Sequence, residues 1–173
     1  MSQQDRNAVK VAIDKLGYDF DHFELNDFIR HVERVLRREI ILLPFAFDPG
    51  LSALWVRAET AHYIFYNDRT HAIHQAHSIL HEIGHIVLNH ACRPLDQVLP
   101  PELLKLLQTL QPQGRLRKAG LPLRQDPEEQ EAEMFVFVIQ KSLLLKQRQF
   151  EVMGQSSSNE ALRKWVDSMA FDV

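Results

Sequence analysis

The sequence predicts an α+β domain in which a small three-stranded sheet is packed by helices. Residues 39–67 hold three short apolar runs, and turn-forming residues such as Pro49 and Gly50 separate them, as is typical of strands. The segments before and after these runs place apolar residues three and four positions apart, which is the period of a helix. The expected order along the chain is therefore helices, then sheet, then helices.

The predicted domain spans residues 1–173. Its first part supports this order of elements. Residues 1–38 are expected to form N-terminal helices, with a helical stripe that is clearest at Phe28, Ile29 and Val32. Residues 39–67 form the predicted sheet, because their apolar runs are short and rich in β-branched and aromatic side chains.

The second part of the chain contains two long helical patterns on either side of an irregular segment. A helix is expected over residues 70–92. Another is expected over residues 128–148, and this second segment lacks both glycine and proline. Between them, residues 93–127 hold six of the eight prolines, so we interpret this segment as an insertion and a candidate flap. A last helix is expected over residues 159–170.

Composition excludes several classes of protein. The formal net charge of −3 allows a local basic patch but does not indicate a basic face, so direct contact with nucleic acid is not expected. The longest apolar runs, at 40–47 and 134–139, are far shorter than the roughly 20 residues of a membrane span. A single cysteine allows no disulfide within the chain, and the polar first residues do not resemble a secretory signal. A cytoplasmic protein without membrane contact is expected.

Seven of the nine histidines lie between His62 and His90, and two of them belong to an H-E-x-x-H motif, His81-Glu82-Ile83-Gly84-His85. Imidazoles four residues apart share one face of a helix, so both can bind one metal ion. Glu82 lies about 100° further round the helix, where it can act as general base on a water at the metal. Zn²⁺ is the expected ion, because it accepts such ligands and keeps a position open for water.

A catalytic zinc ion normally takes a third protein ligand, and the predicted helix over 128–148 offers carboxylates for it. Its beginning carries four glutamates, any of which the helical pattern allows: Glu128, Glu129, Glu131 and Glu133. A carboxylate from this helix together with His81 and His85 would form a site of two histidines and one glutamate.

The chain from about residue 63 to 139 resembles the ImmA/IrrE-type metallopeptidases. Residues 75–90, Gln-Ala-His-Ser-Ile-Leu-His-Glu-Ile-Gly-His-Ile-Val-Leu-Asn-His, are similar to the active-site helix of that family. Residues 129–135, Glu-Gln-Glu-Ala-Glu-Met-Phe, are similar to its second motif, whose first glutamate is a zinc ligand. The resemblance thus implies Glu129 as third ligand in a minimal zincin-like metallopeptidase domain.

The resemblance also implies an activity and a partner. A family member is a zinc-dependent endopeptidase that hydrolyses a peptide bond in a helix-turn-helix repressor and so derepresses its genes. Two alternatives stay open: a zinc-containing regulatory protein that grips a repressor without cutting it, and a protease with an unrelated, toxin-like target. The retained Glu82 disfavours the first alternative, because a purely structural zinc site does not need a base.

Other side chains near the motif have no assigned role. His74 and His77 precede His81 on roughly the same helix face, so they either face solvent or support the site. His90 either donates a hydrogen bond near the site or only ends the helix. Tyr63 and Tyr66 are candidates for stabilising an oxyanion by their nearness in sequence alone.

Overall fold

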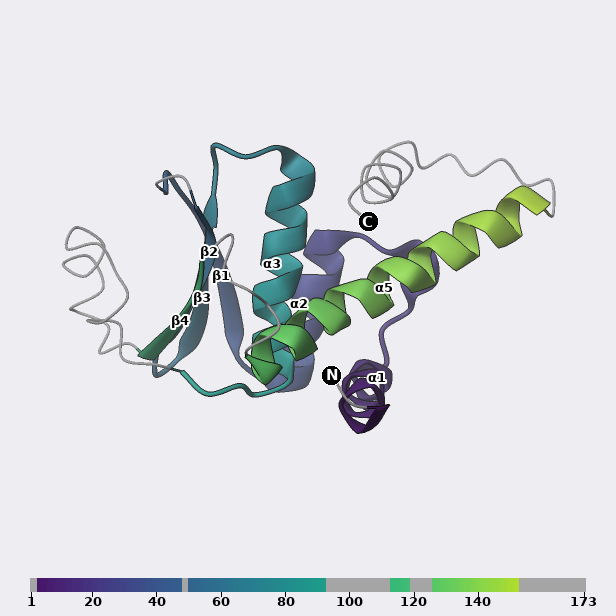
Figure 1. The fold of residues 1–173 in the computed structure, drawn as a ribbon, viewed down its shortest axis with the longest axis horizontal. Helices are drawn as coiled ribbons and strands as arrows, with labels where there is room; N and C mark the ends of the chain where they lie inside the picture. Colours follow the sequence, from purple (N-terminus) through teal and green to yellow (C-terminus); the bar gives the residue numbers. More distant parts are fainter. Residues whose placement is uncertain (1–2, 48–49, 93–112, 119–125, 153–173) are drawn as a thin grey trace.

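The computed structural model describes residues 3–47, 50–92, 113–118 and 126–152. A mixed sheet forms one layer, and the helices lie together on one side of it (Figure 1). These helices are α1 (Gln3–Leu16), the 3₁₀ turn η1 (Phe20–His22), α2 (Leu25–Leu36), α3 (Ala72–Val87) and α5 (Pro127–Val152). The predicted α+β class with helices packed on a small sheet is confirmed.

The sheet contains four strands among the described residues: β1 (Glu39–Phe45), β2 (Leu51–Arg57), β3 (Ala61–Asn67) and β4 (Gln113–Lys118). Their spatial order is β1-β3-β2-β4. β1 is parallel to β3, with Ile40 opposite His62, whereas β2 is antiparallel to β3, with Trp55 opposite Ile64. The three strands predicted over residues 39–67 are therefore present.

The fourth strand is a difference from the prediction. β4 pairs antiparallel with β2 and comes from the segment 93–127, which we expected to be an insertion and candidate flap. Its sequence, Gln-Gly-Arg-Leu-Arg-Lys, is polar and contains a glycine, so neither apolar alternation nor β-branched content marks it as a strand. The rest of the expected flap up to residue 125, and the expected helix over 159–170, lie outside the described residues.

Two helix boundaries also differ from those expected. α3 ends at Val87 rather than near residue 92, because Asn89 takes a left-handed conformation (φ 54°) that stops the helix. α5 begins at Pro127 and continues to Val152, four residues beyond the predicted end. In the N-terminal segment 1–38, α1 and α2 are both present, separated by η1.

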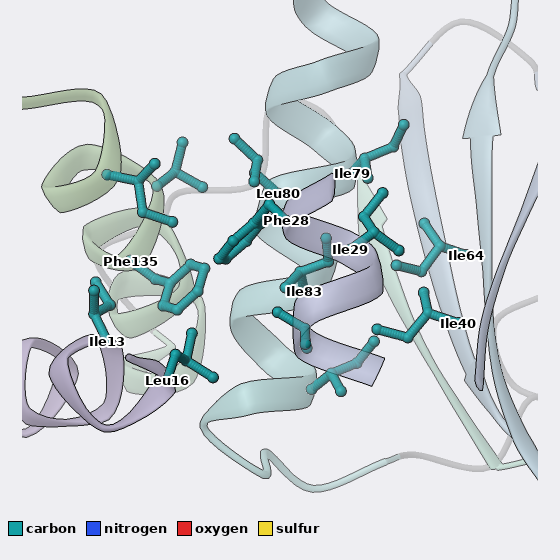
Figure 2. Packing of buried hydrophobic residues seen from close by; sticks show 14 of the residues in the cluster. Ile13, Leu16, Phe28, Ile29, Ile40, Ile64, Ile79, Leu80, Ile83 and Phe135 are labelled. Carbon is teal, nitrogen blue, oxygen red and sulfur yellow. The ribbon is translucent and has the colours of Figure 1, made fainter. Parts of the chain in front are cut away.

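The main hydrophobic core lies between the helices and the sheet, with α3 at its centre. Figure 2 shows Ile13 and Leu16 of α1 with Phe135 of α5 on one side of α3, and Ile40 and Ile64 of the strands on the other. α3 is therefore held on two sides, which fixes the position of the helix and of the side chains that it buries.

A second, smaller cluster packs on the opposite face of the sheet. Side chains alternate along a strand, so Trp55 of β2 and Ile64 of β3 lie in the main core, whereas their neighbours Leu54 and Phe65 lie in this cluster.

Among the described residues, no helix combines the length and the apolar character required to cross a membrane.

Candidate metal centre

Helix α3 brings the two motif histidines into the interior. It is capped by His71, whose side chain accepts a hydrogen bond from the backbone N–H of Ile73. His81 and His85 lie one turn apart and are 0% and 1% exposed. Two buried imidazoles on one helix face require polar partners, and these come from α5 and from the chain that follows α3.

Helix α5 provides the third side chain of the site from its first turn. The side chain of Asp126 accepts a hydrogen bond from the N–H of Glu128 at 3.1 Å, and Pro127 occupies the first helical position. This cap fixes where α5 begins, and hence the position of Glu129 two residues later. Figure 1 shows that this beginning of α5 lies against the C-terminal end of α3.

His81, His85 and Glu129 form a group whose ligand atoms all lie within 4.8 Å of one another. Nε2 of His81 is 3.0 Å from Nε2 of His85 and 3.2 Å from Oε2 of Glu129, and Nε2 of His85 is 3.5 Å from Oε1 of Glu129. In a tetrahedral site with bonds of about 2.1 Å, ligand atoms are about 3.4 Å apart. The three closest contacts are near this spacing and involve both carboxylate oxygens of Glu129, so the three side chains could hold one metal ion.

The charge of Glu129 is maintained by the two imidazoles. Burial raises the pKa of Glu129, but hydrogen bonds from His81 and His85 and their electrostatic attraction outweigh this effect. The result is a pKa well below that of an ordinary glutamate, so Glu129 is a carboxylate at neutral pH. An ionised carboxylate is the form that binds a metal cation.

Glu133, one turn after Glu129, contacts the far side of the first histidine. Its Oε2 lies 3.3 Å from Nδ1 of His81, and its Oε1 lies 3.4 Å from Nε2 of His77. A carboxylate can only accept, so Nδ1 of His81 carries the proton and donates. Nε2 of His81, the atom that faces Glu129 and His85, also lies against a carboxylate, and a bound metal would take the place of a proton there.

The chain after α3 contacts the far side of the second histidine. Nδ1 of His85 lies 2.7 Å from Nδ1 of His90, and Nε2 of His90 lies 3.0 Å from Oε2 of Glu131. Each motif histidine is thus hydrogen-bonded through Nδ1 while its Nε2 faces the common centre.

Strand β2 contributes the indole of Trp55, which lies beside the site. Its ring is nearly parallel to that of His85, with 6.5 Å between the ring centroids, and its Nε1 donates a hydrogen bond to Nδ1 of His62 at 3.1 Å. Burial, followed by the positive charges of Arg38 and Arg57, lowers the pKa of His62 to about 4. His62 is therefore neutral at physiological pH and can accept this hydrogen bond.

The structure distinguishes among the four glutamates that the sequence left open. Glu129 is in the group with His81 and His85, whereas Glu133 contacts Nδ1 of His81 and Glu131 contacts His90. Glu128 accepts a hydrogen bond from the backbone N–H of Ala91. The ligand position implied by the resemblance and the one given by the geometry agree.

The remaining candidates fall into two sets. Glu82 is 1% exposed on α3, within the same turn as the two histidines, and His77 contacts Glu133 and Gln140. By contrast, His74 is exposed to solvent, and Tyr63 packs with the cluster on the sheet face opposite α3. The supporting roles of Glu131 and Glu133 were not predicted. The sequence signal that could have revealed the contact of Glu133 is its spacing of four residues from Glu129, which places both side chains on one face of the helix.

Comparison with known proteins returned no match to any family model, to any curated protein or to any solved structure.

Proposed function

We propose that this chain is a zinc-dependent endopeptidase that hydrolyses a peptide bond in a helix-turn-helix transcriptional repressor. The observation that carries the proposal is the convergence of His81, His85 and Glu129, with ligand atoms within 4.8 Å, next to a buried Glu82. Two imidazoles and one carboxylate are the donor set of catalytic zinc sites that keep a fourth position open.

The donor set fits zinc by its chemistry as well as its spacing. Both imidazoles are held through Nδ1, so their Nε2 atoms face Glu129 and would bind a metal in place of a proton, and Glu129 is ionised. Ca²⁺ and Mg²⁺ prefer oxygen ligands, and this site offers two nitrogen ligands and one carboxylate.

The chemistry divides between the metal and Glu82. Zinc, when bound, supplies a Lewis acid that polarises the scissile carbonyl and acidifies water. The carboxylate of Glu82 takes a proton from the attacking water and then delivers it to the nitrogen of the leaving amine. His81, His85 and Glu129 hold their positions throughout, because α3 and α5 are packed in the core.

The substrate class rests on the resemblance to the ImmA/IrrE-type metallopeptidases, carried by residues 75–90 and 129–135. In that family the target is a helix-turn-helix repressor, and its cleavage releases the repressed genes. The expected place of this activity is the cytoplasm, and no direct nucleic-acid contact is needed, because the repressor makes that contact itself.

The test is a cleavage assay that reads intact masses. Zinc-loaded protein is mixed with helix-turn-helix repressors, beginning with any encoded beside its own gene, and Glu82→Gln is assayed alongside. Defined fragments with the wild type and none with the variant would support the proposal, provided that both proteins bind zinc equally. Fragments at equal rates from both proteins would overturn the role of Glu82.

Two further outcomes select the alternatives. A stable zinc-dependent complex without fragments would favour a protein that grips its repressor without cutting it. Cleavage of unrelated proteins while repressors stay intact would favour a toxin-like protease.

A further inference from the structure

We propose that His90, held by Glu131, is a positioning residue for the metal ligand His85. This inference rests on the metal site of the proposed function and adds a second support to it, separate from that of Glu133 on His81.

The backbone after α3 turns back so that His90 faces His85. The N–H of His90 donates to the carbonyl of His85 at 3.0 Å, and the N–H of Asn89 donates to that of Ile86 at 3.1 Å. With Asn89 in the left-handed region (φ 54°), these two bonds form a Schellman motif. Had the helix continued, His90 would lie about 140° round the axis from His85 and could not reach its ring.

The short contact between the two imidazoles defines their protonation states. If Nε2 of His85 binds the metal, its Nδ1 must carry the proton and donate it to Nδ1 of His90, 2.7 Å away. Nδ1 of His90 then accepts, so the proton of His90 is on Nε2. That atom lies 3.0 Å from Oε2 of Glu131, an obligate acceptor when ionised. Each hydrogen bond from His85 through His90 to Glu131 therefore joins one donor to one acceptor.

Arg57 of β2 also contacts the turn formed by Asn89 and His90. Its Nη2 donates to Oδ1 of Asn89 at 3.2 Å and lies 3.5 Å from the carbonyl oxygen of His90. The guanidinium also lies over the ring of Trp55, 5.0 Å from its centroid, and Trp55 stacks beside His85. His90 is 5% exposed and is therefore fixed by α3, α5 and β2 together.

The experiment measures zinc affinity by competition with a chelator and the visible spectrum of the Co²⁺-substituted protein. His90→Leu removes the acceptor for His85, and loss of such outer partners typically weakens metal binding about 10–100-fold. We expect that loss together with shifted Co²⁺ bands. His74→Leu is the matched control, because it makes the same change at an exposed position of α3.

A conservative variant separates positioning from bulk packing. In His90→Asn, the amide oxygen can take the place of Nδ1 as acceptor, so affinity should recover most of the loss and the Co²⁺ bands should return toward the wild type. Glu131→Ala, at a side chain 26% exposed, gives a second route if His90→Leu does not fold, and should weaken zinc binding in the same direction.

The inference would be overturned if Glu131→Ala and a folded His90→Leu both bind zinc as the wild type does, with unchanged Co²⁺ bands. A wild type that binds zinc and cleaves its substrate would in that case leave the proposed function intact. A wild type that binds neither Zn²⁺ nor Co²⁺ would overturn the proposed function and this inference together, so the two failures are distinguishable.

Discussion

The backbone of Gly84 on α3 faces Phe135 on α5 so closely that a Cβ built on Gly84 would lie 3.2 Å from the Cβ of Phe135. The same Cβ would lie 3.3 Å from the Cα of Ala132. The two helices can approach this closely because Gly84 has no side chain at the contact. Gly84 stands between the two motif histidines, and Ala132 stands three residues after Glu129, so this contact sets the distance across the candidate metal site.

Gly84→Ala should therefore weaken both packing and metal binding. Overpacking in a core costs about 1–3 kcal/mol, whereas replacing glycine by alanine in a helix gains about 1 kcal/mol. We expect the free energy of unfolding, measured with urea, to fall by about 1 kcal/mol and zinc affinity to fall with it. His74→Ala, at an exposed position of the same helix, is the control for helix propensity. A Gly84→Ala protein with higher stability and unchanged affinity would contradict the packing argument.

Glu129→Ala should reduce zinc affinity more than any other single change among the glutamates of α5. Loss of an outer partner costs about 10–100-fold, so removal of a direct ligand should cost more than about 100-fold. Glu128→Ala is the matched control, because Glu128 is adjacent, accepts a hydrogen bond from the backbone of Ala91 and is not in the group formed by His81, His85 and Glu129. Isothermal titration with Zn²⁺ measures both. Unchanged affinity in Glu129→Ala would move the ligand to another glutamate.

Much of the fold could be predicted because its signals are local. The three strands over residues 39–67 and the helix with the H-E-x-x-H motif follow from apolar periodicity and turn residues. The strand order and the parallel pairing of β1 with β3 depend on contacts distant in sequence, which periodicity does not carry. β4 was missed because its sequence is polar and contains a glycine, so no apolar alternation marks it as a strand.

The candidate site, like the fold, could be predicted only where its residues are close together in the sequence. His81 and His85 follow from their spacing of four residues on one helix. The choice of Glu129 over Glu133 does not follow from spacing, because both lie on one face of α5, and it depends on how α5 crosses α3 at Gly84. The contact of His90 with His85 depends on the helix end at Val87, followed by the left-handed Asn89, which we expected five residues later, at residue 92.

Removal of metal should destabilise the fold, because the ligands come from two helices that the metal would join. Zinc at 100 times its dissociation constant stabilises the folded state by about 2.7 kcal/mol. For a chain of this length, that corresponds to a rise in Tm of about 5–10 °C over protein treated with EDTA. Differential scanning calorimetry measures the shift, and Glu129→Ala should lose most of it. Equal Tm values with saturating zinc and with EDTA would contradict binding at this site.

His62 should make the metal-free protein less stable as the pH falls from about 6.5 to about 4. The folded state holds its pKa at about 4, below the ordinary value of 6.5. Well above pH 6.5 neither state is protonated at this side chain, so it contributes no pH dependence there. Between the two values the unfolded chain takes up a proton that the folded chain does not, and the free energy of unfolding falls.

His62→Gln isolates this contribution, because its amide oxygen can accept the hydrogen bond of Trp55 and does not titrate. Urea unfolding in EDTA, repeated from pH 8 to pH 4 in roughly half-unit steps, should give curves that run parallel above about pH 7 and diverge below it, with the wild type losing more stability. Glu129 shifts stability in the same direction, since its pKa is also lowered, but it does so in both proteins and cancels in the difference. Parallel curves across the whole range would show that His62 takes up its proton equally in the folded and unfolded states, and that burial beside Arg38 and Arg57 does not lower its pKa.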